Sequence, residues 1–438
     1  MIKVLKFGGT SVGSAQNMKR VAEIVRHEQA TITVLSAMSG TTDALVQISK
    51  LAANKNLTEI EKVIDTLREK YTTCIEGLLE THREQALERM ELSWATIRNA
   101  ATFFHPYTSE RTIISQGELL TSAIFTYYMI ESGSEAVYLT APEFMVMDAD
   151  KKVDTKLLRE KLTSLIEDKS KLYITQGFIC TNSKGEIDNL GRGGSDYSAA
   201  LMGAAINAAQ VQIWTDIDGM HNNDPRYVDH TFPIRTMSFS EAAELAYFGA
   251  KILHPSTIQP CQDQNIPVLL KNTMNPDAPG TTISNNEDAN AESFHAVAAK
   301  DNITVIRIYS ARMLMAYGFL RKVFEVFEQY RTPIDMITTS EVAVSLTIDN
   351  DENLDKIVGT LSSLGKIEIE RNNSIVCVVG RLEHSVTGLA ARVLDSIRQI
   401  PLKMISYGAS HHSITMLINT ADKKQTLQYL NDYLFEKR

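Results

Sequence analysis

Short runs of β-branched and apolar residues alternate with longer helical patterns over about the first 285 residues, and this alternation is the strongest constraint on the fold. It is typical of a mostly parallel sheet covered by helices. The predicted strands are Ile2–Phe7, Thr31–Leu35, Leu172–Ile179, Val211–Trp214 and Ile266–Leu270. The stretch from Ala44 to about Ala101 has almost no Gly or Pro and is rich in Glu, Leu, Lys and Ala, so we expect it to be largely helical. The chain therefore begins with an open α/β domain.

A change of pattern marks the end of this domain. The turn-rich loop 275–282 and the polar run 284–293 have no hydrophobic periodicity. Beyond them, short strands and helices repeat in a similar order, which predicts two α+β, ferredoxin-like modules of the βαββαβ type. We expect domains at 1–290, 291–373 and 374–438, with the strand that leads into the first module included in it. An α/β domain followed by two such modules suggests a catalytic part with a ligand-sensing part attached.

Charge and cysteine content exclude several classes of function. The chain has 44 Lys and Arg against 53 Asp and Glu, a formal net charge of −9, so neither nucleic acid nor an anionic membrane is an expected partner. Its four cysteines are far apart, without a CxxC pair, which argues against a zinc site and suits a reducing compartment. The first residues lack the apolar region of a signal peptide, and no apolar run is long enough to span a bilayer. We expect a cytoplasmic protein.

A glycine pair directly follows the first predicted strand, in the segment KFGGTSVG (6–13). Glycines just past a strand let backbone N–H groups approach a phosphate closely. The lysine precedes the glycines here, so the GxxxxGK[ST] pattern is absent. By itself the segment indicates either a phosphate-binding loop or a tight turn.

A second glycine cluster, NLGRGGSD (189–196), leads into an Ala-rich helix predicted over Tyr197–Ala209. Ser195 or Asp196 can cap this helix, and Arg192 is a planar, permanently charged partner for a carboxylate or phosphate. The cluster favours an anion site, with a flexible glycine turn and a solvated arginine as the alternative.

Further polar segments stand at predicted strand ends or helix starts: SAMSGTTD (36–43), SQGE (115–118) and WTD (214–216). Open α/β sheets bind ligands beyond the carboxyl ends of their strands. Taken singly, each segment is more typical of capping or turn formation than of a binding site. The same holds for FGAKILHP (248–255), in which Lys251 and His254 could be a surface lysine and the end of a helix.

Together and in this order, these segments resemble one family, the aspartokinases of the amino acid kinase superfamily. The resemblance rests on KFGGTSV, SAMSGTTD, SQGE, TQGF, LGRGGSDYSAAL, WTDIDG, NDPR and FGAKILHP. It continues through RMLMAYGFLRKVFEVFEQY, PIDMITTSEVAVSLT and ISYGASHHSITMLI, which look like the paired ACT regulatory modules of that family. It implies an amino acid kinase catalytic domain over 1–290 and ACT modules over 291–373 and 374–438.

The family transfers the γ-phosphoryl group of MgATP to the side-chain carboxylate of L-aspartate, giving 4-phospho-L-aspartate, the first step towards lysine, threonine and methionine. By motif position, the resemblance implies that Lys6 and Lys251 are catalytic cations at the phosphates. Asp196 would orient Lys6 or the substrate, and Gly8 and Gly9 would donate backbone N–H groups to the nucleotide. Mg²⁺ is expected to arrive with ATP, so we expect no metal site formed by the protein and no organic cofactor.

The acceptor site has to pair one ammonium group and two carboxylates. The resemblance places Glu118 at the ammonium group and Arg192 at the α-carboxylate. Ser36, Thr42 and Ser195 would add further contacts to the substrate.

The sugar and base of the nucleotide are expected over Thr215 and Asp216, with Arg226 of the NDPR segment reaching a phosphate. The sequence departs from the family pattern here, because His221 stands where a tyrosine is common. A histidine ring can still stack on adenine.

The ACT resemblance implies feedback by an end-product amino acid bound between modules of two subunits, so a homodimer or tetramer is expected. GFLRKVF and IDMITTSE resemble the lysine-sensitive, single-function branch, which makes lysine the expected effector. The residues implied to line the effector site are Met313, Phe319, Leu320, Asp335, Thr339, Ser340 and Glu341. Ala316 replaces a small polar serine of relatives and leaves threonine open as an effector.

Two other interpretations remain. A kinase of the same superfamily acting on glutamate, acetylglutamate, carbamate or UMP would share the sheet and a glycine loop, but not the full set of motifs or the ACT pair. A catalytically inactive amino acid sensor would have no physical need for the set that this chain retains: Lys6, Glu118, Arg192, Asp196 and Lys251.

Overall fold

The computed structural model describes residues 1–191, 193–249, 253–285, 293–313, 317–383 and 385–435. These residues form two compact units. Unit 1 comprises Met1–Met220, Arg235–Phe239 and Leu253–Glu287, and unit 2 comprises His221–Ile234, Ser240–Ile252 and Asp288–Arg438. Arg192, Lys251 and Ala316 lie outside the described residues. The domain boundaries at 290 and 373 stay sequence predictions.

Unit 1 is built on a mostly parallel sheet with the strand order β3-β4-β2-β1-β7-β9-β10-β8. The strands are β1 (Lys3–Phe7), β2 (Ile32–Leu35), β3 (Ala136–Tyr138), β4 (Leu172–Gln176), β7 (Gln210–Thr215), β8 (Thr236–Ser238), β9 (Val268–Asn272) and β10 (Thr281–Ser284). Of the strand pairs that the described residues form in this sheet, only β9 with β10 is antiparallel. Every residue of β2 and β4 is buried, as expected for apolar strands covered on both faces. The expected α/β fold is confirmed.

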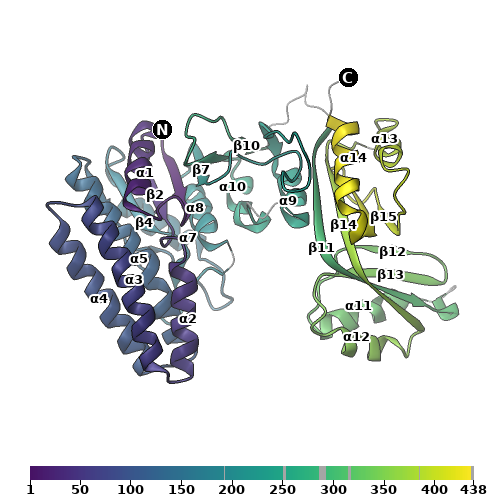
Figure 1. Cartoon of the computed structure of the whole chain (residues 1–438), viewed down its shortest axis with the longest axis horizontal. Coiled ribbons are helices and arrows are strands. Elements are labelled where there is room, and N and C mark those ends of the chain that lie inside the picture. The colour runs from purple at the N-terminus through teal and green to yellow at the C-terminus, as the bar shows by residue number, and fades with distance from the viewer. Residues whose placement is uncertain (192, 250–252, 286–292, 314–316, 384, 436–438) are drawn as a thin grey trace. The chain divides into compact units, whose positions relative to one another are not determined.

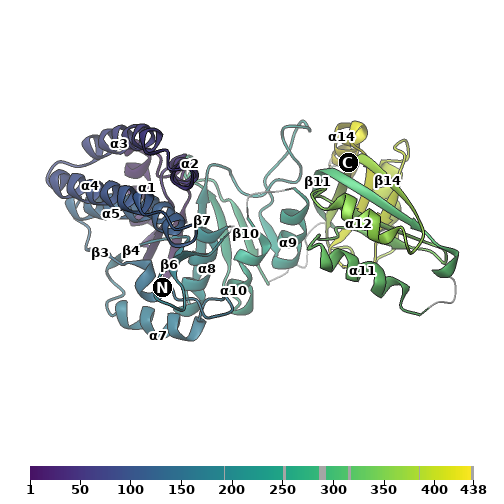
Figure 2. The ribbon, with the colours of Figure 1, turned by 90° about the horizontal axis from the view of Figure 1, so that it is seen from below.

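Helices cover both faces of this sheet (Figures 1 and 2). Those on one face are α1 (Ala15–Glu28), α2 (Thr41–Ala53), α3 (Leu57–Leu78), α4 (Arg83–Thr102) and α5 (Thr108–Glu131), and those on the other include α7 (Thr155–Leu165), α8 (Gly194–Ala205) and α10 (Gln259–Asp263). Shorter elements are α6 (Ala141–Phe144), η1 (Pro255–Thr257) and the hairpin of β5 (Ile179–Thr181) and β6 (Ile187–Asn189). Tyr71 and Trp94 are fully buried between α3 and α4, where their rings meet edge to face at 5.9 Å.

Two local predictions for unit 1 are wrong. The strand expected over Leu172–Ile179 ends at Gln176, because Phe178 adopts a left-handed backbone conformation with φ of 68° that a continuous strand does not allow. Helix α8 begins at Gly194, with Gly193 as its N-cap at φ of 69°. Ser195 and Asp196 therefore lie in the first turn of α8 and do not cap it.

Unit 2 contains an antiparallel sheet with the strand order β12-β13-β11-β14-β16-β15. Its elements are α9 (Phe239–Phe248, from Ser240 onwards), β11 (Phe294–Tyr309), η2 (Ala311–Met313), α11 (Phe319–Gln329), β12 (Ile337–Thr339), β13 (Ala343–Ile348), α12 (Leu354–Leu361), β14 (Lys366–Gly380), α13 (Leu389–Ser396), β15 (Met404–Ser406), β16 (Ser413–Asn419), η3 (Thr420–Asp422) and α14 (Lys423–Phe435). The long strands β11 and β14 pair antiparallel along their length (Figure 1). They connect two hydrophobic cores, one with α11 and α12 and one with α13 and α14.

The segment 221–234 packs on the second of these cores. Asn222 Nδ2 donates to Asn431 Oδ1 at 3.0 Å, and Asn223 Nδ2 donates to the carbonyl oxygen of Leu427 at 3.1 Å. Val228 is buried in the same core. This part of the kinase-like sequence therefore belongs structurally to the ACT-like unit.

Among the helices that the described residues form, none combines the length and apolar character that a bilayer span requires. The four cysteines, Cys74, Cys180, Cys261 and Cys377, are free and buried.

Candidate active site

The loops that follow β1 and β2 pack against each other at the carboxyl edge of the unit 1 sheet. The N–H of Ser39 donates to the carbonyl oxygen of Gly9 at 3.0 Å. A Cβ atom at Gly9 would lie 2.7 Å from the carbonyl oxygen of Ala37, and one at Gly13 would lie 2.9 Å from Ser39 Oγ. Glycine at these positions thus allows the KFGG and SAMSG segments to form one surface.

An ion pair stands at this edge. Lys6 Nζ, near the end of β1, lies 2.7 Å from Asp196 Oδ1, in the first turn of α8. The two side chains are only 12% and 14% exposed. The structure therefore brings together Lys6 and Asp196, which are 190 positions apart in the sequence, as a partly buried cation with a fixed carboxylate partner.

The start of α8 also contacts the ends of β2 and β4. Ser36 Oγ donates to Ser195 Oγ at 3.0 Å. A Cβ atom at Gly177, just past β4, would lie 2.6 Å from Ser195 Cβ, so only glycine allows this approach. Gly177 lies in the TQGF motif but was not selected from the sequence as a site residue. Its role depends on a contact with a residue 18 positions away in the chain.

Glu118 is a buried carboxylate beside these loops. Its residue is 4% exposed, and Oε2 has no hydrogen-bond partner among the described residues. Burial raises the pKa of Glu118 to about 7, although hydrogen bonds from its own backbone and from that of Ala37 act in the opposite direction. Helix α5 holds Glu118 against the loop after β2, where the N–H of Met38 donates to Thr121 Oγ1 at 3.2 Å. The open acceptor suits a cationic ligand group such as an ammonium.

The ends of β7 and β9 lie next to the loop after β1. Ser11 Oγ and Thr273 Oγ1 are hydrogen-bonded at 2.7 Å, and the N–H of Thr273 donates to the carbonyl oxygen of Thr215 at 2.8 Å. Thr215 Oγ1 donates in turn to Asp216 Oδ1 at 3.1 Å. Thr215 and Asp216 thus stand on the same edge as the glycine loop.

Other residues selected from the sequence already have partners within the chain or are exposed, and their roles stay predictions. The N–H of Gly8 donates to the carbonyl oxygen of Trp214 at 3.2 Å and so is already used within the sheet. Arg226 Nη2 lies 2.6 Å from Asp224 Oδ2, so its guanidinium is paired within unit 2. His221 also lies in unit 2, where its Nδ1 is 3.2 Å from Thr231 Oγ1. Thr42 is exposed in the first turn of α2.

The residues expected at the effector site lie in unit 2 in different environments. Phe319 is buried in the core of α11 and α12, with Met313 packed against that core. The exposed members are Leu320, Thr339, Ser340 and Glu341. The side chain of Asp335 is 1% exposed and takes part in a network with Tyr247 and Lys300, neither of which was selected from the sequence.

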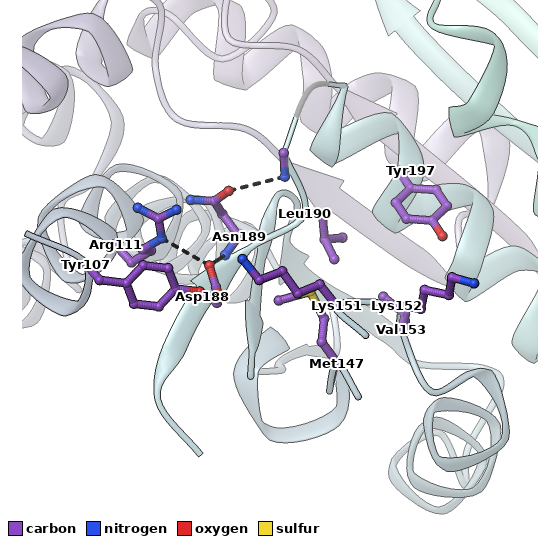
Figure 3. Close-up of a pocket in the computed structure, with 11 residues that line it drawn as sticks. Tyr107, Arg111, Met147, Lys151, Lys152, Val153, Asp188, Asn189, Leu190 and Tyr197 are labelled. Atoms are coloured by element: carbon purple, nitrogen blue, oxygen red, sulfur yellow. Dashed lines mark hydrogen bonds and ion pairs between the residues drawn. The ribbon is translucent and has the colours of Figure 1, made fainter. Parts of the chain in front are cut away.

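A cavity of about 290 Å³ opens near the start of α5 (Figure 3). Its lining includes Tyr107, Arg111, Lys151 and Asn189–Gly191, the residues that directly precede Arg192. Arg111 Nε donates to Asp188 Oδ1 at 3.2 Å, and the guanidinium carbon Cζ of Arg111 lies 4.2 Å from the centre of the Tyr107 ring. This cavity was not predicted. Elsewhere in the described residues, no cluster of three His, Cys, Asp or Glu side chains suited to a metal ion is present.

Two protein families match parts of this chain. The model of the amino acid kinase family matches residues 1–272, and an ACT domain model matches residues 376–434. The chain is 34% identical to the lysine-sensitive aspartokinase 3 of Escherichia coli, over 99% of both chains.

Two solved structures of Escherichia coli aspartokinase III are similar to the present one. The complex with aspartate and ADP, described as the R-state, has a TM-score of 0.84 at 33% identity and covers 100% of both chains. The complex with lysine and aspartate, described as the T-state, has a TM-score of 0.82 at 34% identity and covers 99% of this chain and 100% of that one.

The amino acid kinase part and the ACT part thus match one family, and its members align with nearly the whole chain. This chain belongs to the aspartokinase family and is a kinase.

Proposed function

We propose that this kinase transfers the γ-phosphoryl group of MgATP to the side-chain carboxylate of L-aspartate and that lysine inhibits it through the ACT-like unit. The observation that carries the proposal is the Lys6–Asp196 ion pair at the sheet edge, beside the Ser36–Ser195 contact. The complex of Escherichia coli aspartokinase III with aspartate and ADP supports the choice of substrates.

In the proposed reaction, a side-chain oxygen of aspartate attacks the γ-phosphorus while the bond from phosphorus to the bridging oxygen of ADP breaks. The carboxylate needs no base, because it is already ionised. Catalysis then consists of positioning and of stabilising charge on the transferring group. Lys6 supplies a cation that Asp196 holds in place, and Lys251 is proposed as a second one. Mg²⁺ enters as part of the substrate MgATP and neutralises charge on the phosphates.

For the acceptor, we propose that Glu118 receives the ammonium group of aspartate. Its buried carboxylate, with Oε2 open, would gain the partner that it lacks among the described residues. Arg192 is proposed to bind the α-carboxylate, with Ser36, Thr42 and Ser195 completing the contacts. A site with an acidic group at one end and cations at the other fits an amino acid with two carboxylates.

Regulation by lysine is supported by the lysine-sensitive relative and by its complex with lysine and aspartate. We propose that the effector binds near Asp335 and that the chain acts as a homodimer or tetramer through its ACT modules.

The catalytic assignment is tested by changing Lys6→Met and measuring MgATP-dependent aspartyl phosphate, trapped with hydroxylamine. Loss of a preorganised cation should lower kcat by about 10²-fold or more. Lys3→Met is the matched control, because Lys3 lies on the same strand but pairs with Glu28 at 3.0 Å, away from Asp196. Equal loss in both variants, or none in Lys6→Met, would refute the role of Lys6.

A further inference from the structure

The carboxylate of Asp335 already binds a cation from its own chain. Asp335 Oδ1 accepts a hydrogen bond from Lys300 Nζ, on β11, at 2.8 Å. The same oxygen accepts one from the hydroxyl group of Tyr247, on α9, at 2.5 Å. All three residues belong to unit 2. Segments separated by more than 30 residues in the sequence therefore meet at one buried acidic group.

Lys300 is held on more than one side. Its Nζ lies 2.9 Å from Asp349 Oδ2 and 4.4 Å from the centre of the Tyr247 ring. Burial acts to lower the pKa of Lys300, but its hydrogen bonds with Asp335 and Asp349 outweigh burial and raise the pKa above the ordinary value. The side chain is therefore a stable ammonium group, and it is only 19% exposed.

The network is nevertheless incomplete. Asp335 Oδ2 is buried and has no hydrogen-bond partner among the described residues. Two carboxylates, Asp335 and Asp349, face a single ammonium group, which leaves one net negative charge. The cluster can accept a second cationic group, but Lys300 reduces its attraction for that group.

We propose that the ammonium group of Lys300 competes electrostatically with that of the effector and thereby sets the affinity of the effector site. The inference rests on the proposed function, in which Asp335 receives the ammonium group of an amino acid effector. That group would bind the open Oδ2 of the same carboxylate, and two ammonium groups a few ångströms apart repel each other. Lys300, whose Nζ lies 2.8 Å from Oδ1, therefore weakens effector binding.

The test is isothermal titration of L-lysine, and separately of L-threonine, into the full-length protein. Lys300→Met removes the competing charge and should tighten binding of the effector by about tenfold. Lys300→Arg keeps the charge and should stay within a few-fold of the wild type. Tyr247→Phe removes a hydrogen bond to Asp335 without changing the charge and should not tighten binding. Unchanged or weaker binding in Lys300→Met, in protein with a normal unfolding transition, overturns the proposal.

A second substitution covers the case in which Lys300→Met does not fold. The side chain of Asp349 is 37% exposed, so Asp349→Asn should be tolerated. It removes one negative charge and should weaken effector binding several-fold, whereas binding as in the wild type contradicts the charge argument.

Asp335→Asn distinguishes a wrong effector site from a wrong role of Lys300. If it binds the effector as the wild type does, the proposed effector site is wrong. If it loses binding while Lys300→Met shows no gain, the site stands and the role of Lys300 is wrong. Absence of binding of both amino acids in the wild type and in Lys300→Met overturns both.

Discussion

Glu118 is a buried carboxylate, and its proposed role in substrate recognition would come at a cost in stability. Its pKa of about 7 follows from burial, which favours the neutral acid. An ammonium group placed at Oε2 would favour the charged form. Binding of aspartate at pH 6 to 7 should therefore expel a proton from Glu118.

The same pKa predicts a pH-dependent stability. The unfolded chain loses the proton of Glu118 near the ordinary value of 4.5, whereas the native protein keeps it until about pH 7. Between these values the native state binds more protons, so the free energy of unfolding contributed by this group falls as pH rises. Glu118→Gln should remove this decrease in the free energy of unfolding, which is roughly 3 kcal/mol at most.

Denaturant unfolding at pH 5 and pH 7.5 measures this effect. Glu84→Gln, at an exposed position of α4, is the control and should keep the pH dependence of the wild type. A Glu118→Gln protein with the same pH dependence as the wild type would show that Glu118 titrates normally.

Among the elements, the contact between the end of β4 and the start of α8 positions the site most directly. Gly177→Ala would place a Cβ atom 2.6 Å from Ser195 Cβ and 2.7 Å from its Cα, so the first turn of α8 has to move. Ser195 and Asp196 would move with it. Since misplacement by about 1 Å can cost about 10²-fold in rate, we expect a loss of this order in kcat/KM for aspartate.

Gly359→Ala, in helix α12, is the matched control for this substitution. An added Cβ atom meets no atom within 4 Å there, and alanine favours the helix. Its kinase activity should equal that of the wild type. Full activity in Gly177→Ala would mean that the start of α8 does not position the reacting groups.

Sequence patterns predict elements whose determinants are local. The apolar runs of β1, β2 and β7 mark buried strands, and the unbroken helical composition of 44–101 corresponds to α2, α3 and α4. The first half of β11, by contrast, is Ala-rich, and the strand expected to lead into the first module was predicted without bounds. It is a strand because residues 294–300 pair with residues 375–380 of β14.

In the same way, some residues of the candidate sites can be found from local motifs and others cannot. Lys6 and Asp196 were selected because their motifs are distinctive, although their contact depends on the sheet. Lys300 and Tyr247 carry no local signal, because an isolated lysine and tyrosine acquire meaning only from their distance to Asp335. Long-range contacts of this kind follow from tertiary structure alone.

For the whole molecule, the division into two units does not follow the limits of the kinase sequence. Residues 221–234 and 240–252 belong to unit 2, although the amino acid kinase model spans them. Tyr247 lies four residues before Lys251 in the sequence and is bonded to Asp335.

The proposed choice of acceptor is tested by measuring ADP formation from MgATP with one acceptor at a time. L-Aspartate, L-glutamate, N-acetyl-L-glutamate and UMP are compared at equal concentration, with hydroxylamine present to trap an acyl phosphate. We predict ADP and hydroxamate with L-aspartate and none above background with the other acceptors. Turnover of another acceptor in preference to L-aspartate, or no turnover in folded protein, would contradict the proposed function.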